Sequence, residues 1–164
     1  DLHLVGPTRG VWRRTLRQQA QSLRVLRSVH FAGATRHEDL LPVLHTAHLC
    51  VAPLPADSRN AIQGCCPLKL LEYMAAGCPI VATHIAPVLE VLTDGVTARL
   101  GMPGSSLALA QGLLWMLEHP AERVAMADAA RMAVMERFRP ARVVAQLDQA
   151  LALAQRFTRI GCRR

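Results

Sequence analysis

One lysine and one glutamate stand three residues apart at the start of a short predicted helix. The helix opens the segment PLKLLEYMAAGCPIVAT at residues 67–83, where Pro67 suits the first helical position because it has no N–H to satisfy. Lys69 follows in the first turn, and Glu72 comes one turn later. Backbone N–H groups at a helix start attract phosphate, and a carboxylate accepts hydrogen bonds from sugar hydroxyls. The pattern therefore indicates a nucleotide, with its diphosphate on Leu68 and Lys69 and its ribose on Glu72. The alternatives are that Lys69 is a solvated helix residue and that Glu72 is a surface carboxylate favoured by the helix dipole.

The same segment predicts how this helix is held. Leu68, Leu71 and Ala75 recur at helical spacing, and Gly77 stands where a helix ends in a left-handed residue. The apolar run Pro79–Ala82 then predicts a strand that is buried on both faces. We therefore expect the helix to begin beside the ends of neighbouring strands, which is where open α/β sheets bind ligands.

Short apolar runs alternate with helical stretches over most of the chain, which predicts an α/β fold with a Rossmann-like parallel sheet flanked by helices. Three more helices follow the last strand, with Ser106 as the expected N-cap of the first. Strands are expected near Leu2–Gly6, Ser28–Gly33, Leu49–Leu54, Cys78–Thr83 and Ala98–Gly101. Helices are expected near Val11–Leu26, Glu38–Thr46, Pro67–Ala76, Pro87–Leu92, Ser106–Glu118, Ala121–Phe138 and Ala141–Phe157.

The order of these pieces resembles the C-terminal half of retaining GT-B glycosyltransferases of the glycosyl transferases group 1, or family 4-like, type. LHLVG at residues 2–6 is similar to the family's strand and glycine loop, and VHFAGAT at residues 29–35 is similar to its strand ending in a glycine. HEDLLPVLHTAHLCVAPLP at residues 37–55 resembles the next helix and strand. PVLEVLTDGVTARL at residues 87–100 resembles the Pro-Glu helix, the Asp-Gly turn and the following strand.

The resemblance implies roles for individual residues. Glu72 would hold the ribose of the donor nucleotide, and backbone groups of Gly33, Ala34 and Thr35 would contact the base. The alternative for these three residues is an ordinary βα turn. The family commonly has another glutamate eight positions earlier, but this chain has Gly64 there, which offers no carboxylate to the donor hexose. In the Pro-Glu helix, Glu90 is expected to act as a structural cap or turn partner.

A polar segment of small residues, 56–66, joins the predicted third strand to the Pro67 helix. Its place at the carboxyl edge of the sheet favours a flexible loop over the donor sugar, with a plain connector as the alternative. Gly64, Cys65 and Cys66 are the candidate sugar contacts within it. His84, just past the fourth strand, is either a further sugar contact or an incidental turn residue.

Arginines supply almost all of the positive charge in a chain whose formal net charge is +7. They cluster at residues 9–27, on the first predicted helix and its borders, and again at residues 156–164. A nucleic acid or an anionic membrane surface is one interpretation, and a solvated helix face is the other. Nucleic acid is disfavoured, because no aromatic residues interleave with the arginines as they do in proteins that bind single strands.

The five cysteines are odd in number and lack the CxxC spacing of a metal site, so no metal is expected. No organic cofactor is expected either. Cys50 and Cys78 fall in predicted strands, where a free cysteine usually serves as a small apolar residue. No apolar run has the roughly 18 residues of a membrane span, and there is no signal-peptide pattern. A reducing cytoplasm is the expected setting, with a peripheral place at the inner membrane face as the alternative.

The length of 164 residues fits one domain, which we expect at residues 1–157, followed by a basic tail at residues 158–164. Because Asp1 opens directly on a strand-like run, we expect a piece of a longer protein that lacks the first strand–helix unit and an N-terminal domain. The resemblance implies that the full enzyme transfers a hexose from a UDP- or GDP-hexose to a hydroxyl acceptor with retention, and that the isolated chain is inactive. A sugar-nucleotide epimerase of the same fold and a degenerate, non-catalytic nucleotide-binding or interaction module remain as alternatives.

Overall fold

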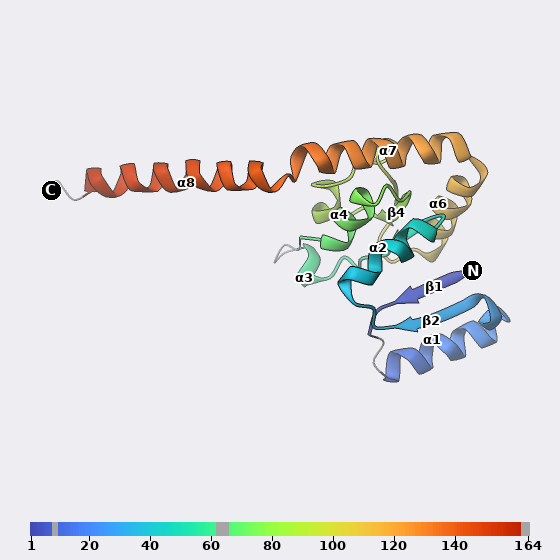
Figure 1. Cartoon of the computed structure of the whole chain (residues 1–164). Coiled ribbons are helices and arrows are strands. Elements are labelled where there is room, and N and C mark those ends of the chain that lie inside the picture. Colours follow the sequence, from blue (N-terminus) through green and yellow to red (C-terminus); the bar gives the residue numbers. More distant parts are fainter. Residues whose placement is uncertain (8–9, 62–65, 162–164) are drawn as a thin grey trace. The chain divides into compact units, whose positions relative to one another are not determined.

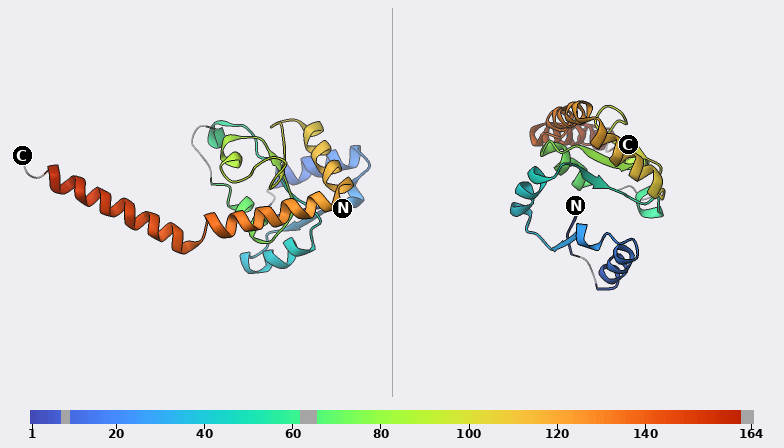
Figure 2. Two further views of the ribbon diagram at one scale, coloured as in Figure 1. Left: turned by 90° about the horizontal axis from the view of Figure 1, so that it is seen from above. Right: turned by 90° about the vertical axis from the view of Figure 1, so that its right-hand side faces the viewer.

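The structure, a computed structural model, describes residues 1–7, 10–61 and 66–161 of the chain. The chain divides into two compact units, residues 1–43 and residues 44–164. Figure 1 labels most of the helices and strands, and Figure 2 gives two further views of them.

The N-terminal unit consists of two parallel strands joined by a helix. Its elements are β1 (Leu2–Val5), α1 (Gly10–Ser22), the 3-10 turn η1 (Leu26–Ser28) and β2 (Val29–Gly33). The guanidinium carbons of Arg13 and Arg17 lie 5.7 and 6.0 Å from the centroid of the Phe31 ring. Two arginines of α1 therefore cover an aromatic side chain of β2, and they border a hollow of about 340 Å³ with Phe31. This packing gives part of the arginine cluster a structural role.

The C-terminal unit contains a parallel sheet in the order β3-β4-β5. Helix α2 (His37–Thr46) spans the boundary between the units. The elements that follow it are β3 (Cys50–Ala52), α3 (Ser58–Ala61), α4 (Leu68–Ala75), β4 (Ile80–Thr83), α5 (Ala86–Leu89), β5 (Arg99–Gly101), α6 (Ser106–Glu118), α7 (Pro120–Arg137) and α8 (Pro140–Gly161).

Both faces of the central strand β4 are covered, which explains why its four residues are all buried. Ile80 on one face belongs to the cluster that includes Leu70 and Met74 of α4. On the other face, Val81 packs with Met116 of α6. Alternate residues of a strand point to opposite faces, so this short apolar run needs a helix on each side. The predicted α/β fold of parallel strands flanked by helices is confirmed, and the five strands of the described residues are divided between a two-stranded and a three-stranded sheet.

Several details differ from the sequence-based expectations. The N-cap of α6 is Ser105 rather than Ser106, and its hydroxyl accepts a hydrogen bond from the Ala108 N–H at 3.1 Å. Cys78 is buried but precedes β4 instead of lying in it. Helix α3 occupies part of the expected loop. Helix α8 continues beyond Phe157 to Gly161, so the expected basic tail is helical at its start.

The described side chains of α8, residues 141–155, are all exposed. They include an apolar set spaced along the helix, at Val143, Val144, Leu147, Leu151 and Leu153. None of the helices in the described part of the chain combines the length and the apolar character that crossing a membrane requires.

Candidate functional site

The start of α4 lies at the carboxyl edge of the three-stranded sheet. The chain leaves β3 at Ala52, reaches α4 through α3, and enters β4 only after α4 has ended. Helix α4 therefore runs back along the parallel strands, and its N-terminus is at the edge where the strands end. A hydrogen bond from the Thr83 hydroxyl to the Leu54 carbonyl, 2.7 Å long, ties the ends of β4 and β3 together at this edge.

Pro67 is the N-cap residue of α4. The sequence pattern predicts it one position later in the helix, as the first helical residue. Its φ of −78° is the usual proline value, but its ψ of 75° is not helical. The Leu68 N–H donates to the Cys66 carbonyl at 2.9 Å, and the Leu70 N–H donates to the Pro67 carbonyl at 2.8 Å. The N–H of Lys69 stands in the first turn, where backbone donors have no carbonyl acceptor within the helix. Among the candidate amides, that of Lys69 is therefore better placed for an anion than that of Leu68.

The core fixes the orientation of α4. Leu70 and Met74 are fully buried, whereas Leu68 is 65% exposed. The helix ends at Gly77, whose φ of +70° confirms the predicted left-handed stop. The helix is thus anchored by Leu70 and Met74, and its first turn leaves Leu68 and Lys69 exposed.

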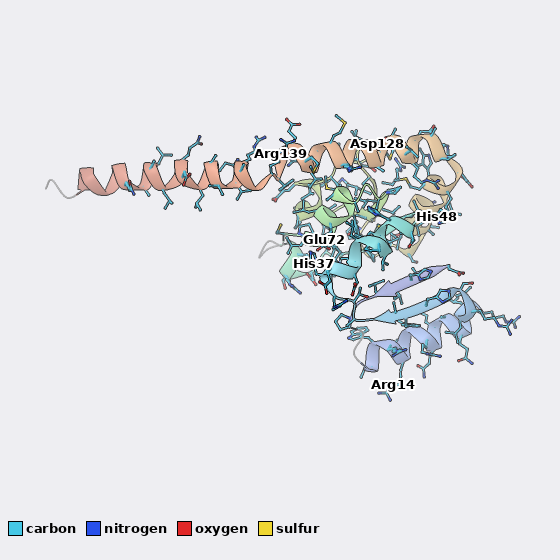
Figure 3. All side chains as sticks on the ribbon, viewed as in Figure 1. Arg14, His37, His48, Glu72, Asp128 and Arg139 are labelled. Atoms are coloured by element: carbon cyan, nitrogen blue, oxygen red, sulfur yellow. The ribbon has the colours of Figure 1, made fainter. Side chains whose placement is uncertain are left out.

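Glu72 lies one turn behind the start of α4 and is half-buried (Figure 3). Its charge is one of the influences that raise the pKa of the neighbouring Tyr73 to about 12, after burial and the charge of Cys50. A half-buried carboxylate in this position can accept hydrogen bonds from a polar ligand while its own location is fixed by the helix.

A cleft of about 670 Å³ adjoins the start of α4 within the C-terminal unit. Cys66 and Pro67 form one part of its lining, Glu90 and Val91 form another, and the end of α7 contributes Arg137 and Phe138. Glu72 is not among these lining residues. The start of α4 and Arg137 thus line the same cleft, and Glu72 lies one turn further along the helix.

Arg137 was not expected from the sequence as a residue near α4. Its Nη2 donates to the Glu90 carbonyl at 2.6 Å, and its guanidinium lies 5.3 Å from the centroid of the Phe138 ring. Glu90 is the C-cap residue of α5, so its expected structural role is consistent with this contact. The sequence offers no local signal for Arg137, because it lies more than 60 residues beyond α4 and only packing brings the two together.

The loop candidates Gly33, Ala34 and Thr35 belong to the N-terminal unit. Gly33 ends β2 with a φ of +78°, and its carbonyl accepts a hydrogen bond from the Gly6 N–H at 2.7 Å. Gly6 also has a positive φ, of +133°. A glycine turn thus stands at the carboxyl end of each of β1 and β2. Such turns expose backbone groups that a planar ligand can approach closely.

The remaining candidates lie in or near the loop between β3 and α4. Gly64 and Cys65 lie outside the described residues, whereas Cys66 is exposed and lines the cleft. His84 directly follows β4 at the same edge and is exposed, and its N–H donates to the Gly101 carbonyl at 2.8 Å. Helix α3 was missed by sequence reasoning, although Asp57 offered a signal, since its carboxylate accepts from the Asn60 N–H at 2.9 Å in the manner of an N-cap.

Comparison with known proteins identifies the family. The family model named Glycosyl transferases group 1 matches residues 1–119. The chain is 32% identical over 120 residues to the glycogen synthase of Mycobacterium tuberculosis (strain CDC 1551 / Oshkosh), a match that covers 73% of this chain and 27% of that protein. It is also 32% identical over 81 residues to the N-acetyl-alpha-D-glucosaminyl L-malate synthase of Bacillus anthracis, covering 49% of this chain and 21% of that one. The chain thus spans about a quarter of the length of these curated relatives.

Solved structures agree with this match in fold. Anabaena HepE, solved in complex with UDP, superposes with a TM-score of 0.76 at 24% identity, over 92% of this chain and 40% of that one. The sucrose-phosphate synthase of Thermosynechococcus elongatus superposes with a TM-score of 0.78 at 25% identity, over 93% and 38% of the two chains. Because the family model covers well over half of the sequence, the chain belongs to the glycosyl transferases group 1 family, and its fold is that of the GT-B glycosyltransferases.

Proposed function

We propose that this chain is the donor-binding half of a retaining glycosyltransferase, which transfers a hexose from a UDP- or GDP-hexose to a hydroxyl acceptor. Membership of the family supports the transferase class. HepE, which shares the fold, has been solved with UDP, with UDP and glucose, and with UDP-glucose. The observation that carries the proposal is the start of α4 at the carboxyl edge of the sheet, with Glu72 one turn behind it.

In this proposal the diphosphate lies against the first turn of α4. The Lys69 N–H and ammonium group bind its oxygens, and Arg137 contributes positive charge from the wall of the cleft. Negative charge develops on the diphosphate as the glycosidic bond breaks, so cations already in place stabilise the transition state. Glu72 accepts hydrogen bonds from the ribose hydroxyls.

Two further groups of residues are proposed as donor contacts, each described within its own unit. In the N-terminal unit, backbone groups of Gly33, Ala34 and Thr35 are proposed to contact the base. The hexose is bound near His84 and Cys66, together with Gly64 and Cys65. The nucleotide sugar is a substrate in this scheme, and no metal takes part in its binding.

The acceptor is bound elsewhere in the full protein. The chain covers about 40% of the length of HepE, and we propose that an N-terminal domain supplies the acceptor site and the remaining contacts to the diphosphate. The 164-residue chain alone should therefore bind nucleoside diphosphates weakly and transfer no sugar. Transfer of hexose by the purified chain from UDP-glucose or GDP-mannose would contradict this part of the proposal.

Calorimetric titration with UDP, GDP and ADP tests the binding site. One of the three should bind, and Glu72→Ala should weaken that binding at least about tenfold, because a hydrogen bond to a charged group contributes roughly 1.5–3 kcal/mol. Glu118→Ala is the matched control, since Glu118 is an exposed glutamate at the end of α6. If none of the three nucleotides binds, or if both variants lose affinity equally, a non-catalytic module of the same fold becomes the better description.

A further inference from the structure

Three side chains of types that can ligate a metal ion meet at the amino ends of β1 and β2 in the N-terminal unit. Asp1 precedes β1, His3 lies within it, and His30 lies in β2. One ligand atom from each residue lies within 4.8 Å of the others. The Nε2 atom of His30 is 3.1 Å from an oxygen of the Asp1 carboxylate. The His3 and His30 rings stack with their centroids 4.7 Å apart and their planes inclined by 21°.

The register of the two strands creates this cluster. His3 is paired directly with His30 in the parallel ladder, and paired residues of neighbouring strands project from the same face of a sheet. Asp1 precedes His3 by two residues, so the period of two returns it to that face. The next pair, Leu4 and Phe31, points to the opposite face, where Arg13 and Arg17 cover Phe31. Backbone pairing therefore sets the spacing of the three ligands.

The donor set determines which ion would fit. Two imidazole nitrogens and one carboxylate oxygen match the combination of two histidines and one acidic residue that holds Zn²⁺ with a further position open to water. Ca²⁺ and Mg²⁺ prefer sites made of oxygen atoms alone. We propose that Asp1, His3 and His30 form a binding site for a borderline divalent transition-metal ion, represented by Zn²⁺, with water completing the coordination.

The alternative is a surface ion pair without a metal. The side chains of His30 and Asp1 are 44% and 59% exposed, so a protonated His30 could form such a pair in contact with solvent. That alternative leaves His3 without a role beyond stacking, whereas the metal site requires it. A substitution at His3 therefore separates the two descriptions.

Zn²⁺ titration of the 164-residue chain tests the proposal. The protein should carry no polyhistidine tag and should be kept reduced. It should also carry Cys65→Ser, Cys66→Ser and Cys162→Ser, which leaves only the buried thiols of Cys50 and Cys78. One equivalent of Zn²⁺ should bind. His3→Gln and His30→Gln should each weaken Zn²⁺ binding by more than about 100-fold. Loss of a residue that only hydrogen-bonds to a metal ligand costs roughly 10–100-fold, and loss of a ligand should cost more. His48→Gln, an exposed histidine of the C-terminal unit, should leave the affinity unchanged.

Co²⁺ supplies a second readout that depends on geometry. It should give a visible absorption spectrum of tetrahedral or five-coordinate type in the parent protein, and His3→Gln should abolish it. Asp1→Asn serves as a further variant that leaves both strands intact, and the melting temperature without metal should be the same in all variants. Absence of saturable Zn²⁺ binding, or equal affinity in His3→Gln and His48→Gln, would overturn the proposal.

Discussion

The two units differ in how many of their described side chains are buried. In the described part of the N-terminal unit, only Ala20 is buried, at 7% exposure. The C-terminal unit contains all of the large side chains that are fully buried: Leu70, Met74, Ile80, Val81, Val88, Leu92 and Met116. A two-stranded sheet is at best marginally stable without further cover. The position of α4 is therefore fixed by a core, whereas the glycine turn of the N-terminal unit is specified by backbone conformation.

This contrast predicts the largest effect at Met74. Replacing this fully buried side chain with alanine leaves a cavity between α4 and β4, and should lower the free energy of unfolding by about 2–5 kcal/mol. Leu68→Ala, in the same helix but 65% exposed, should change it by no more than about 0.5 kcal/mol. Urea unfolding of both variants measures the difference. Equal effects would mean that the core does not anchor α4.

A glycine in the C-terminal unit should be the next most sensitive position. A Cβ atom at Gly101 would lie 3.2 Å from the backbone carbon and oxygen of Ala108, which cannot move without displacing α6. Gly101→Ala should therefore cost about 1–3 kcal/mol, as overpacking typically does. A Cβ at Gly10, in the N-terminal unit, would meet no atom within 4 Å. Gly10→Ala should be neutral or slightly stabilising in thermal unfolding, and a similar loss in both variants would contradict the packing argument.

Gly33 tests the backbone-specified turn of the N-terminal unit. Alanine there meets no neighbour within 4 Å, but the φ of +78° disfavours any side chain. The change should cost about 1 kcal/mol, all of it from backbone strain. Gly33→Asn should cost less than Gly33→Ala, because asparagine tolerates the left-handed region. If alanine and asparagine have the same effect in thermal unfolding, the turn has relaxed to another conformation.

The last prediction concerns alkaline pH and applies over the narrowest range of conditions. Burial is the largest influence that raises the pKa of Tyr73 from 10.0 to about 12. The folded state thus favours the neutral phenol, and this contribution to stability is present below pH 10 and is lost as the pH rises toward 12. Between pH 10 and pH 12, the free energy of unfolding should fall less in Tyr73→Phe than in the parent protein. Urea unfolding at the two pH values measures this difference. Parallel pH profiles would show that the phenol does not contribute.

The fold was predictable because its signals are local. Gly77 as a helix stop and the apolar run of β4 both follow from residue type and short-range spacing, and the structure confirms them. The start of α4 was predicted to within one residue, since proline can serve either as the N-cap or as the first helical residue. The alternation of strands and helices then left few arrangements other than a parallel sheet.

The long-range parts of the structure could not be predicted in this way. Arg137 reaches the cleft beside α4 through the packing of α7, and no motif connects the two in sequence. His3 and His30 are neighbours because of the strand register, which a sequence does not specify when both strands are short. The absence of CxxC spacing led to the expectation of no metal, but it has no bearing on a cluster made of histidines and an aspartate.

The proposed donor site requires that Glu72 binds the ribose, and a binding cycle tests this contact. The affinities of UDP and of 2′-deoxy- and 3′-deoxy-UDP should be measured by calorimetry for the parent protein and for Glu72→Gln, or with the matching GDP series if GDP is the nucleotide that binds. In the parent protein, loss of a contacted hydroxyl should weaken binding about tenfold, whereas in Glu72→Gln the same loss should change it by no more than about threefold. An equal penalty in both proteins would show that Glu72 does not bind the ribose.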